Sequence, residues 1–270
     1  MDTEKFYYDP LKFSHRLIRK SFIFVLAIIF FVLLWWDVSL IVNTAVIPTP
    51  MDAFEALLKL FREGDIVSGY TMWHHIWISL QRFLLGLVIA IVVAVPFGLI
   101  IGSSMSIKDF TSPIIEILRP IAPIAWAPIL VFAIGYNWGP IAVVFIGIFF
   151  PLLTNTIFGV QKIDKVLVDA ARTMGANKSQ IFRTVTLPCA VPYVMNGIRI
   201  GSGIGWMCIV ASELYASSGG GIGYFVGLQA SIGFWPNVYA GIIVIAILGI
   251  MTTALFEYIY KVVVNRMGME

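Results

Sequence analysis

Charged residues are scarce in this sequence. Only 12% of the 270 residues are Asp, Glu, Lys or Arg, whereas hydrophobic residues make up 59%. A soluble globular domain carries about 25% charged residues, so the chain lacks the charge to cover a water-soluble protein of this size. The composition excludes a cytosolic enzyme, a nucleic-acid-binding module and a disordered scaffold. It predicts a protein that crosses a lipid bilayer several times and has no nucleic acid among its partners.

Residues that carry out chemistry are also scarce. The chain has two cysteines, Cys189 and Cys208, and three histidines. The cysteines fall on one expected span, too far apart to pair, and are predicted to be buried thiols. Neither the His-Glu-x-x-His pattern of zinc peptidases nor the phosphate-binding loop of nucleotide hydrolases occurs. We therefore predict a chain that is not an enzyme, with no catalytic residue, no metal site and no cofactor of its own.

Long uncharged runs are abundant, and a spanning helix needs about 20 largely apolar residues. We predict an all-α polytopic membrane protein with about six transmembrane helices in one domain, residues 21–262, between tails 1–20 and 263–270. The runs 120–161 and 214–256 are each long enough for two spans, and turn residues break them at 135–140 in the first and at 217–223 and 234–237 in the second. Further spans are expected in the runs 21–36, 83–107 and 190–214.

The basic residues predict the orientation. Lys and Arg near span ends mark the cytoplasmic side, and most of them fall in segments that a six-span chain places on one side. The opposite side carries only Lys59 and Arg62, so both termini are predicted to be cytoplasmic and the protein to lie in the plasma (inner) membrane. The basic residues assigned to the cytoplasmic side are Lys5, Lys12, Arg16, Arg19, Lys20, Lys108, Arg119, Lys162, Lys165, Arg172, Lys178, Arg183, Lys261 and Arg266.

Two segments outside the spans are expected on the outer side. Thr49 is placed to cap a helix whose first residue is Pro50. Apolar and charged residues then alternate at helical spacing, so residues 49–62 are predicted to form a helix lying in the outer membrane interface. The glycine-rich run 217–223 is expected to form a turn or re-entrant segment at the outer mouth.

The cytoplasmic loop 161–188 has the most informative pattern. An apolar stripe predicts a helix that Gly175 ends through a left-handed cap. Asn177 is placed to cap a second short helix, which Leu187-Pro188 is expected to end. The loop is thus a helix–glycine–helix projection. It either inserts into a groove on a partner protein or is a linker packed on its own membrane domain.

The residues of this loop resemble the coupling motif of permease subunits of ATP-binding-cassette (ABC) importers. That motif reads Glu-Ala-Ala, three residues, Gly, nine residues, Ile, one residue, Leu-Pro, and here Asp169 replaces Glu and Val185 replaces Ile. The resemblance implies a fold like that of type I importer permeases and a loop that docks on a cytoplasmic ATPase. The residues implied in coupling are Asp169, Ala170, Ala171, Met174, Gly175, Leu187 and Pro188.

Three further stretches, 118–128, 197–199 and 221–224, are similar to the branch of that family that handles sulfonates, taurine and nitrate. The resemblance implies an assembly of two permease subunits, expected to be a homodimer, two ABC ATPases that bind ATP and Mg, and an external substrate-binding protein. The implied substrate is a small anion or organic anion of the nitrate, taurine or alkanesulfonate type, moved by alternating access.

Charged residues within spans face a cavity or a partner, so they are candidates for the translocation path. Arg199 and Glu213 are 14 residues apart on the fifth span, which places them on one helical face. That face, with Trp206 between them, either lines the path, or Arg199 reaches toward the interface and Glu213 pairs with a neighbouring span. Arg82 is a further path candidate, and it is also placed to reach the outer interface.

Glycines recur at every fourth position of the fifth span, at Gly197, Gly201 and Gly205. Small residues at this spacing permit close helix packing, either within the chain or at a dimer seam. An ion-gradient-driven secondary transporter or channel is the alternative function. It predicts paired acidic residues at mid-membrane and inverted repeats, and the sequence shows one acid near a span end and no repeat.

Overall fold

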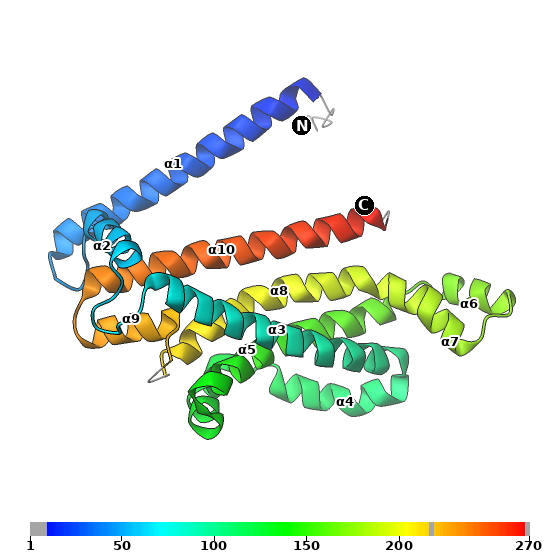
Figure 1. Cartoon of the computed structure of the whole chain (residues 1–270). Coiled ribbons are helices and arrows are strands. Elements are labelled where there is room, and N and C mark those ends of the chain that lie inside the picture. Colours follow the sequence, from blue (N-terminus) through cyan, green and yellow to red (C-terminus); the bar gives the residue numbers. More distant parts are fainter. Residues whose placement is uncertain (1–9, 216–218, 268–270) are drawn as a thin grey trace.

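The computed structural model describes residues 10–215 and 219–267, and all the regular secondary structure in that part of the chain is helical (Figure 1). The expected all-α class is confirmed. The helices are α1 (Pro10–Val42), α2 (Pro50–Arg62), α3 (Met72–Ser103), α4 (Met105–Leu118), η1 (Pro123–Trp126), α5 (Ala127–Gln161), α6 (Lys165–Thr173), α7 (Lys178–Ile181), η2 (Phe182–Thr186), α8 (Leu187–Glu213), α9 (Ile222–Ser231) and α10 (Trp235–Arg266).

Five stretches of the described residues, rather than the expected six, are long enough and apolar enough to span a membrane. The two spans expected in the run 120–161 fall in one stretch, Pro123–Gln161, which is kinked at Gly135, and the loop expected before it forms α4, which ends at Leu118. Proline lacks the backbone N–H that a helix needs, and Pro120 and Pro123 fall in the break after α4. The five stretches are Phe22–Val42, Met72–Ser103, Pro123–Gln161, Lys178–Glu213 and Trp235–Arg266.

Helix α5 is two segments joined at a sharp reversal. Gly135 has φ 89° and ψ 165°, a backbone conformation that only glycine adopts readily. Gly139 lies so close to Val131 that a Cβ on Gly139 would meet the Val131 backbone. Residues 127–134 therefore fold back on residues 136–161. The predicted break at 135–140 is present, and it joins two antiparallel segments.

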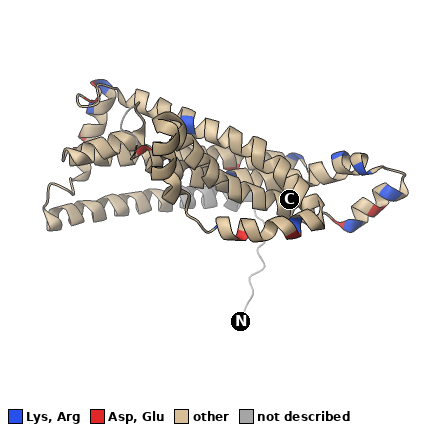
Figure 2. Ribbon diagram, turned by 90° about the horizontal axis from the view of Figure 1, so that it is seen from below, with Lys and Arg blue, Asp and Glu red and all other residues tan. Residues whose placement is uncertain are grey.

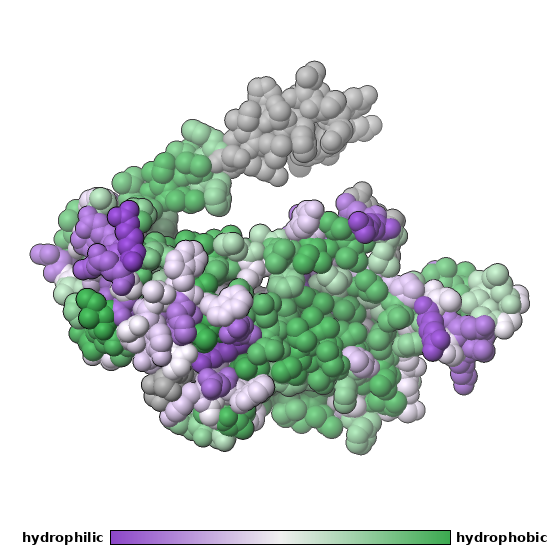
Figure 3. Space-filling model, viewed as in Figure 1, coloured by the Kyte–Doolittle hydropathy of each residue, from purple (hydrophilic) through white to green (hydrophobic). Residues whose placement is uncertain are grey.

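The described ends of the chain lie at one end of the molecule. In Figure 1 the start of α1 and the end of α10 lie at the end from which α6 and α7 project, and α2 and α9 lie at the opposite end. Figure 3 shows a broad apolar surface between these two ends, with hydrophilic residues gathered over α2 and over the α6–α7 projection. This distribution is that of a protein whose middle lies in hydrocarbon.

The helical boundaries differ from the expected tails. Helix α1 begins at Pro10, inside the expected tail 1–20, and α10 continues to Arg266, past the expected end at 262. Residues 1–9, which include Lys5, and residues 268–270 lie outside the described part. The outer helix is present: Thr49 caps α2 by accepting from the backbone N–H of Asp52, whose carboxylate accepts in return from the N–H of Thr49.

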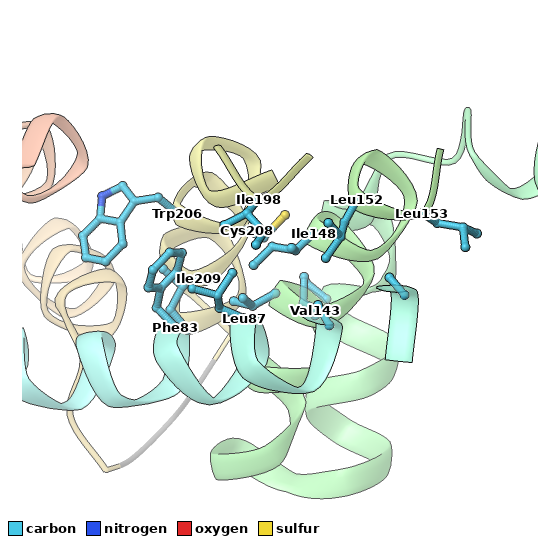
Figure 4. Packing of buried hydrophobic residues seen from close by; sticks show 14 of the residues in the cluster. Phe83, Leu87, Val143, Ile148, Leu152, Leu153, Ile198, Trp206, Cys208 and Ile209 are labelled. Atoms are coloured by element: carbon cyan, nitrogen blue, oxygen red, sulfur yellow. The ribbon is translucent and has the colours of Figure 1, made fainter. Parts of the chain in front are cut away.

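Helices α3, α5 and α8 form the core (Figure 4). Phe83 of α3, Ile148 and Leu152 of α5, and Ile209 of α8 are almost completely buried against one another. Lipid tails are as apolar as leucine, so helices in a bilayer associate through close van der Waals packing and not through the hydrophobic effect. Cys208 lies in this core, and its thiol is free, as is that of Cys189.

Glycine makes the close approach of α8 to α5 possible. A Cβ added to Gly205 would lie 2.7 Å from Cδ1 of Ile148, whereas one added to Gly203, on the other side of α8, would meet nothing within 4 Å. The two positions thus have the same helical backbone and opposite environments.

We predict that Gly205→Ala destabilises the fold relative to Gly203→Ala. Both changes bring the same gain in helix propensity, about 1 kcal/mol, so the difference between them measures the clash with Ile148, about 1–3 kcal/mol. Denaturant unfolding of both variants in mixed micelles checks this, with Gly203→Ala as the control. Equal stability of the two variants would show that α5 and α8 are not held at this distance.

Candidate coupling and transport sites

The α6–α7 projection has the local structure that its sequence predicts. Asp164 caps α6 by accepting from the N–H of Val166 at 2.9 Å. The helix ends at Thr173, and Gly175, just past its C-cap Met174, has a left-handed φ of 84°. The N–H of Gly175 donates to the carbonyl of Arg172, and that of Ala176 to the carbonyl of Ala171, as in a glycine-terminated helix end. The predicted left-handed glycine cap is confirmed.

The second helix begins as predicted but does not end where expected. Asn177 and Gln180 form a reciprocal capping box. Leu187-Pro188 was expected to end this helix, and this is wrong: α7, η2 and α8 form one unbroken helical stretch. Since Pro188 has no N–H to donate, the preceding turn widens to a π-helix, in which the N–H of Leu187 donates to the carbonyl of Phe182. The projection therefore continues directly into the span α8.

The apolar face of α6 is exposed. No residue of α6 is buried, and Val166, Leu167 and Met174 have exposed fractions of 70%, 50% and 88%. Asp169 lies beside them and pairs with Arg172 at 3.2 Å in water-exposed surroundings. Figure 2 shows this end of the molecule carrying several of its charged residues. The loop therefore does not pack on its own membrane domain, which was one of the two alternatives.

The candidate path residues Arg82 and Glu213 pair with each other. The guanidinium of Arg82 donates to Oε1 of Glu213 at 2.9 Å, and both side chains are almost fully buried. Ser79 donates its hydroxyl to the other carboxylate oxygen at 2.7 Å, and the N–H of Gly223 donates to the same oxygen at 3.0 Å. Arg82 therefore does not reach toward the outer interface, and Glu213 pairs with a neighbouring span.

Further polar groups complete this outer cluster. Arg82 also donates to the carbonyl of Gly220 at 3.0 Å and to Oδ1 of Asn137 at 3.3 Å. The N–H of Gly221 donates to Nδ1 of the buried His75 at 3.2 Å. Of the glycine-rich run 217–223, the first two serines lie outside the described residues, and the rest closes over the ion pair. Sequence reasoning missed Ser79, although it precedes Arg82 by one helical turn of α3.

Arg199 contacts a different helix. Its guanidinium pairs with Glu257 of α10 at 2.6 Å, donates to Asn196 at 2.8 Å, and lies over the ring of Tyr260 at 4.9 Å. Arg199 and Glu213 thus share a helical face in sequence but bind α10 and α3 respectively. Sequence reasoning missed Glu257, which directly follows the uncharged run 214–256.

Trp206 and the glycines of α8 lie in packed surroundings. The indole N–H of Trp206 donates to the carbonyl of Ile245 at 3.1 Å, and its ring packs edge-on against Phe83. Gly197 and Gly201 lie against Leu152 and Ile148 of α5, as Gly205 does. These glycines therefore pack within the chain. Their role at a dimer seam and the path role of Trp206 stay predictions.

Comparison with models of known protein families identifies the family of this chain. The family model described as the binding-protein-dependent transport system inner membrane component matches residues 86–269, more than half of the chain. The chain belongs to this family. This permease is thus an inner-membrane, multi-pass subunit of an ABC importer of the binding-protein-dependent type. Family membership decides against the alternative of a secondary transporter or channel.

The relatives agree with this assignment. The permease is 32% identical over 253 residues to the taurine transport system permease protein TauC of Escherichia coli, covering 92% of this chain and 91% of TauC. It is 30% identical over 262 residues to the nitrate import permease protein NrtB of Synechocystis, covering 95% and 93%. The resemblance to the sulfonate, taurine and nitrate branch is confirmed.

The fold has solved counterparts. A chain of the MetNI methionine ABC transporter in an inward facing conformation superposes with a TM-score of 0.62 at 20% identity. The match covers 71% of this permease and 97% of that chain. The likeness establishes the fold of an ABC importer permease.

We predict that Glu213→Gln destabilises this permease strongly. Removing one partner of a buried ion pair leaves the other charge uncompensated, which costs about 3–5 kcal/mol. Glu63→Gln is the matched control, because Glu63 pairs with Lys59 on the surface and such pairs contribute at most about 1 kcal/mol. Denaturant unfolding in mixed micelles measures both. A loss at Glu213 no greater than at Glu63 would contradict a buried pair.

Proposed function

We propose that this permease couples ATP hydrolysis on partner subunits to the import of a small anion delivered by an external binding protein. The observation that carries the proposal is the exposed α6 face, with the coupling motif on it, at the end of a helix continuous with a span. The comparisons support an importer of this class, and the finer steps below are inferred from the side chains.

The α6 helix docks into a groove on the ATPase. Val166, Ala170 and Met174 present an apolar face, and the small Ala170 and Ala171 allow close approach. Asp169 makes a polar contact there, and Gly175 provides the bend that presents the helix. Because α7, η2 and α8 are continuous, a displacement of the projection moves α8 as a unit. Leu187 and Pro188 lie at that transition.

The complete transporter contains two permease subunits, as a homodimer, two ABC ATPases and one external binding protein. ATP and Mg bind to the ATPases, and this chain binds no cofactor and carries out no covalent chemistry. Closure of the ATPases on ATP draws two projections together and favours one of two global states. The loaded binding protein biases the same equilibrium from the outside.

The projection and both chain termini lie on the cytoplasmic side. The described start of α1, the end of α10 and the α6–α7 projection share one end of the molecule (Figure 1). Basic residues are concentrated in the segments at that end, which the positive-inside rule assigns to the cytoplasm. Helix α2 and the turn before α9 then face the binding protein.

The substrate is a nitrate, taurine or alkanesulfonate type of anion. The names of TauC and NrtB, which the chain matches over more than nine-tenths of its length, support this class. In such importers the binding protein supplies most of the selectivity, so the permease has to accept a common anionic group.

The coupling contact is tested by Gly175→Asp. The added carboxylate would lie at the docking surface, and we expect the ATPase recovered with the purified permease to fall at least about tenfold, a change of about 1.4 kcal/mol in binding. Gly69→Asp is a matched control, because Gly69 is also a left-handed glycine (φ 73° against 84°) with no atom within 4 Å of an added Cβ. The two variants carry equal backbone strain at opposite ends of the molecule.

Full recovery of ATPase with Gly175→Asp, together with unchanged uptake, would contradict coupling through α6. Equal losses in Gly175→Asp and Gly69→Asp would assign the effect to backbone strain and contradict it as well. Uptake by the permease alone under an ion gradient, with no ATPase present, would contradict the proposed energy source.

The substrate class is tested on the binding protein encoded beside this permease. We expect nitrate, taurine or an alkanesulfonate to raise its melting temperature, because binding of a ligand to the folded state stabilises it. Neutral and cationic ligands of similar size are the controls. Stabilisation by these and not by anions would overturn the substrate assignment.

A further inference from the structure

Arg119 lies away from the cytoplasmic end of the helices, beside α5 and α8. It directly follows α4, whose first turns are tied to the cytoplasmic end of α5 by Lys108, which donates to Gln161 at 3.2 Å. Arg119 is eleven residues farther along, and at 1.5 Å per residue its backbone is about 16 Å from that level. This distance puts Arg119 well away from the cytoplasmic helix ends, near which we expected it from the sequence. The segment predicted as a loop between the second and third spans instead forms α4, which carries the chain to Arg119.

Arg119 differs from the other two intramembrane arginines. Arg82 and Arg199 each have a carboxylate partner. Among the described residues Arg119 has no ion pair and no side-chain hydrogen bond, and it is exposed. A charged group at membrane depth pairs or faces a water-filled cavity, because hydrocarbon solvates it poorly. Arg119 therefore requires an aqueous cavity and is available to an incoming anion.

Two cavities meet at Arg119. One of about 290 Å³ lies between residues 119–123, α5 and α8, and is lined by Arg119, Thr154, Asn155 and apolar side chains. A second, of about 240 Å³, lies between α4 and α5 and extends to Lys108 and Gln161. Both are lined by Arg119 and Thr154, so they form one route from the middle of the membrane to the cytoplasmic end. The first has roughly the volume of the smallest ligand pockets, about 300 Å³.

Two hydrogen bonds fix the orientation of the Asn155 side chain. Its amide nitrogen donates to the carbonyl of Pro151 at 2.8 Å, and its oxygen accepts from Asn196 at 2.9 Å. Asn196 in turn accepts from Arg199, which pairs with Glu257. One N–H of the Asn155 amide has no partner among the described residues. The intramembrane Arg199 thus acts through Asn196 to orient Asn155 and does not itself line the cavity.

We propose that Arg119, with the amide N–H of Asn155, forms an oxyanion site at mid-membrane in the transport path. The site takes the sulfonate or nitrate group of the substrate and passes it toward Lys108. Glu116 lines the inner cavity, so the route keeps one more positive than negative charge between Arg119 and Lys108. This inference rests on the proposed import of an anion and adds the residues that bind it.

A second copy of the permease covers the open side of the site. Ile121 and Ile200, which line the cavity, have exposed fractions of 36% and 43%. If this side faced lipid, the guanidinium of Arg119 would lie beside hydrocarbon, and placing a charge there costs free energy. The same face of α8 carries Gly203, with no atom within 4 Å of an added Cβ, so another helix has room to approach there.

The test uses the whole transporter, with ATPases and binding protein, in proteoliposomes. We expect Arg119→Gln to lower ATP-dependent uptake of radiolabelled taurine or nitrate about ten- to a hundredfold, since it removes a charge-assisted hydrogen bond. ATPase activity stimulated by the loaded binding protein should stay within about twofold, because coupling is intact. Arg119→Lys keeps the charge without the planar fork and should recover part of the uptake. Arg266→Gln, at the exposed end of α10, is the matched loss of one positive charge.

A second pair of variants leaves Arg119 in place. Thr154→Asp adds a carboxylate to both cavities and should abolish uptake by neutralising Arg119. Thr154→Ser keeps the hydroxyl that donates to the carbonyl of Phe150 and should transport normally. These two variants test the oxyanion site even if the Arg119→Gln permease fails to assemble into the transporter.

The outcomes separate the two levels of inference. Absence of ATP-dependent anion uptake by the wild-type complex, with its binding protein loaded, would overturn the proposed function. Normal uptake by the wild type and by Arg119→Gln or Thr154→Asp would overturn the oxyanion site alone. A parallel loss of uptake and stimulated ATPase activity in Arg119→Gln and Thr154→Asp would make Arg119 structural and would also overturn it.

Discussion

A hydrocarbon interior solvates charge poorly, and this constraint accounts for the ion pairs that join the long helices of the permease. With few charges in the chain, each one at membrane depth needs a specific reason to be there. Arg82 and Glu213 neutralise each other at the outer end of α3 and α8. Arg199 and Glu257 do so between α8 and α10. Four further hydrogen bonds are made to the first pair, which offsets the cost of removing its charges from water.

The same constraint applies to the helices that would transmit movement from the cytoplasmic projection into the membrane. A helix that carries motion from the cytoplasm into the bilayer needs a backbone whose hydrogen bonds are all made internally. The π-turn before Pro188 meets that requirement, because it re-forms a bond around the residue that has no N–H. Helix α8 then packs on α5 through glycines over most of its length. In the proposed mechanism, movement of the α6–α7 projection therefore displaces α8 and α5 together.

Sequence reasoning predicted local features well. The left-handed Gly175, the capping residues Thr49 and Asn177, and the break near Gly135 each depend on backbone chemistry within a few residues, and each is present. Contacts between side chains that are far apart in the sequence were harder to predict. Arg82 and Glu213 are 131 residues apart, and a helical wheel of one span gives no information on which neighbour lies opposite. The wheel grouped Arg199 with Glu213, although each side chain binds a different helix.

Arg119 shows why hydropathy alone misplaced a charge. A run of residues that contains charges and prolines is scored as a loop, although α4 and the following segment carry the chain deep into the protein. In the proposed path, three arginines lie at membrane depth: Arg82 and Arg199 are paired with carboxylates, and Arg119 lines a cavity. The neutralised ones still contribute to the proposed path, because the Arg199–Asn196–Asn155 chain of hydrogen bonds orients the amide beside Arg119. A transport protein whose own selectivity is modest needs little more than this: one positive charge without a carboxylate partner, in a cavity that water and an anion can enter.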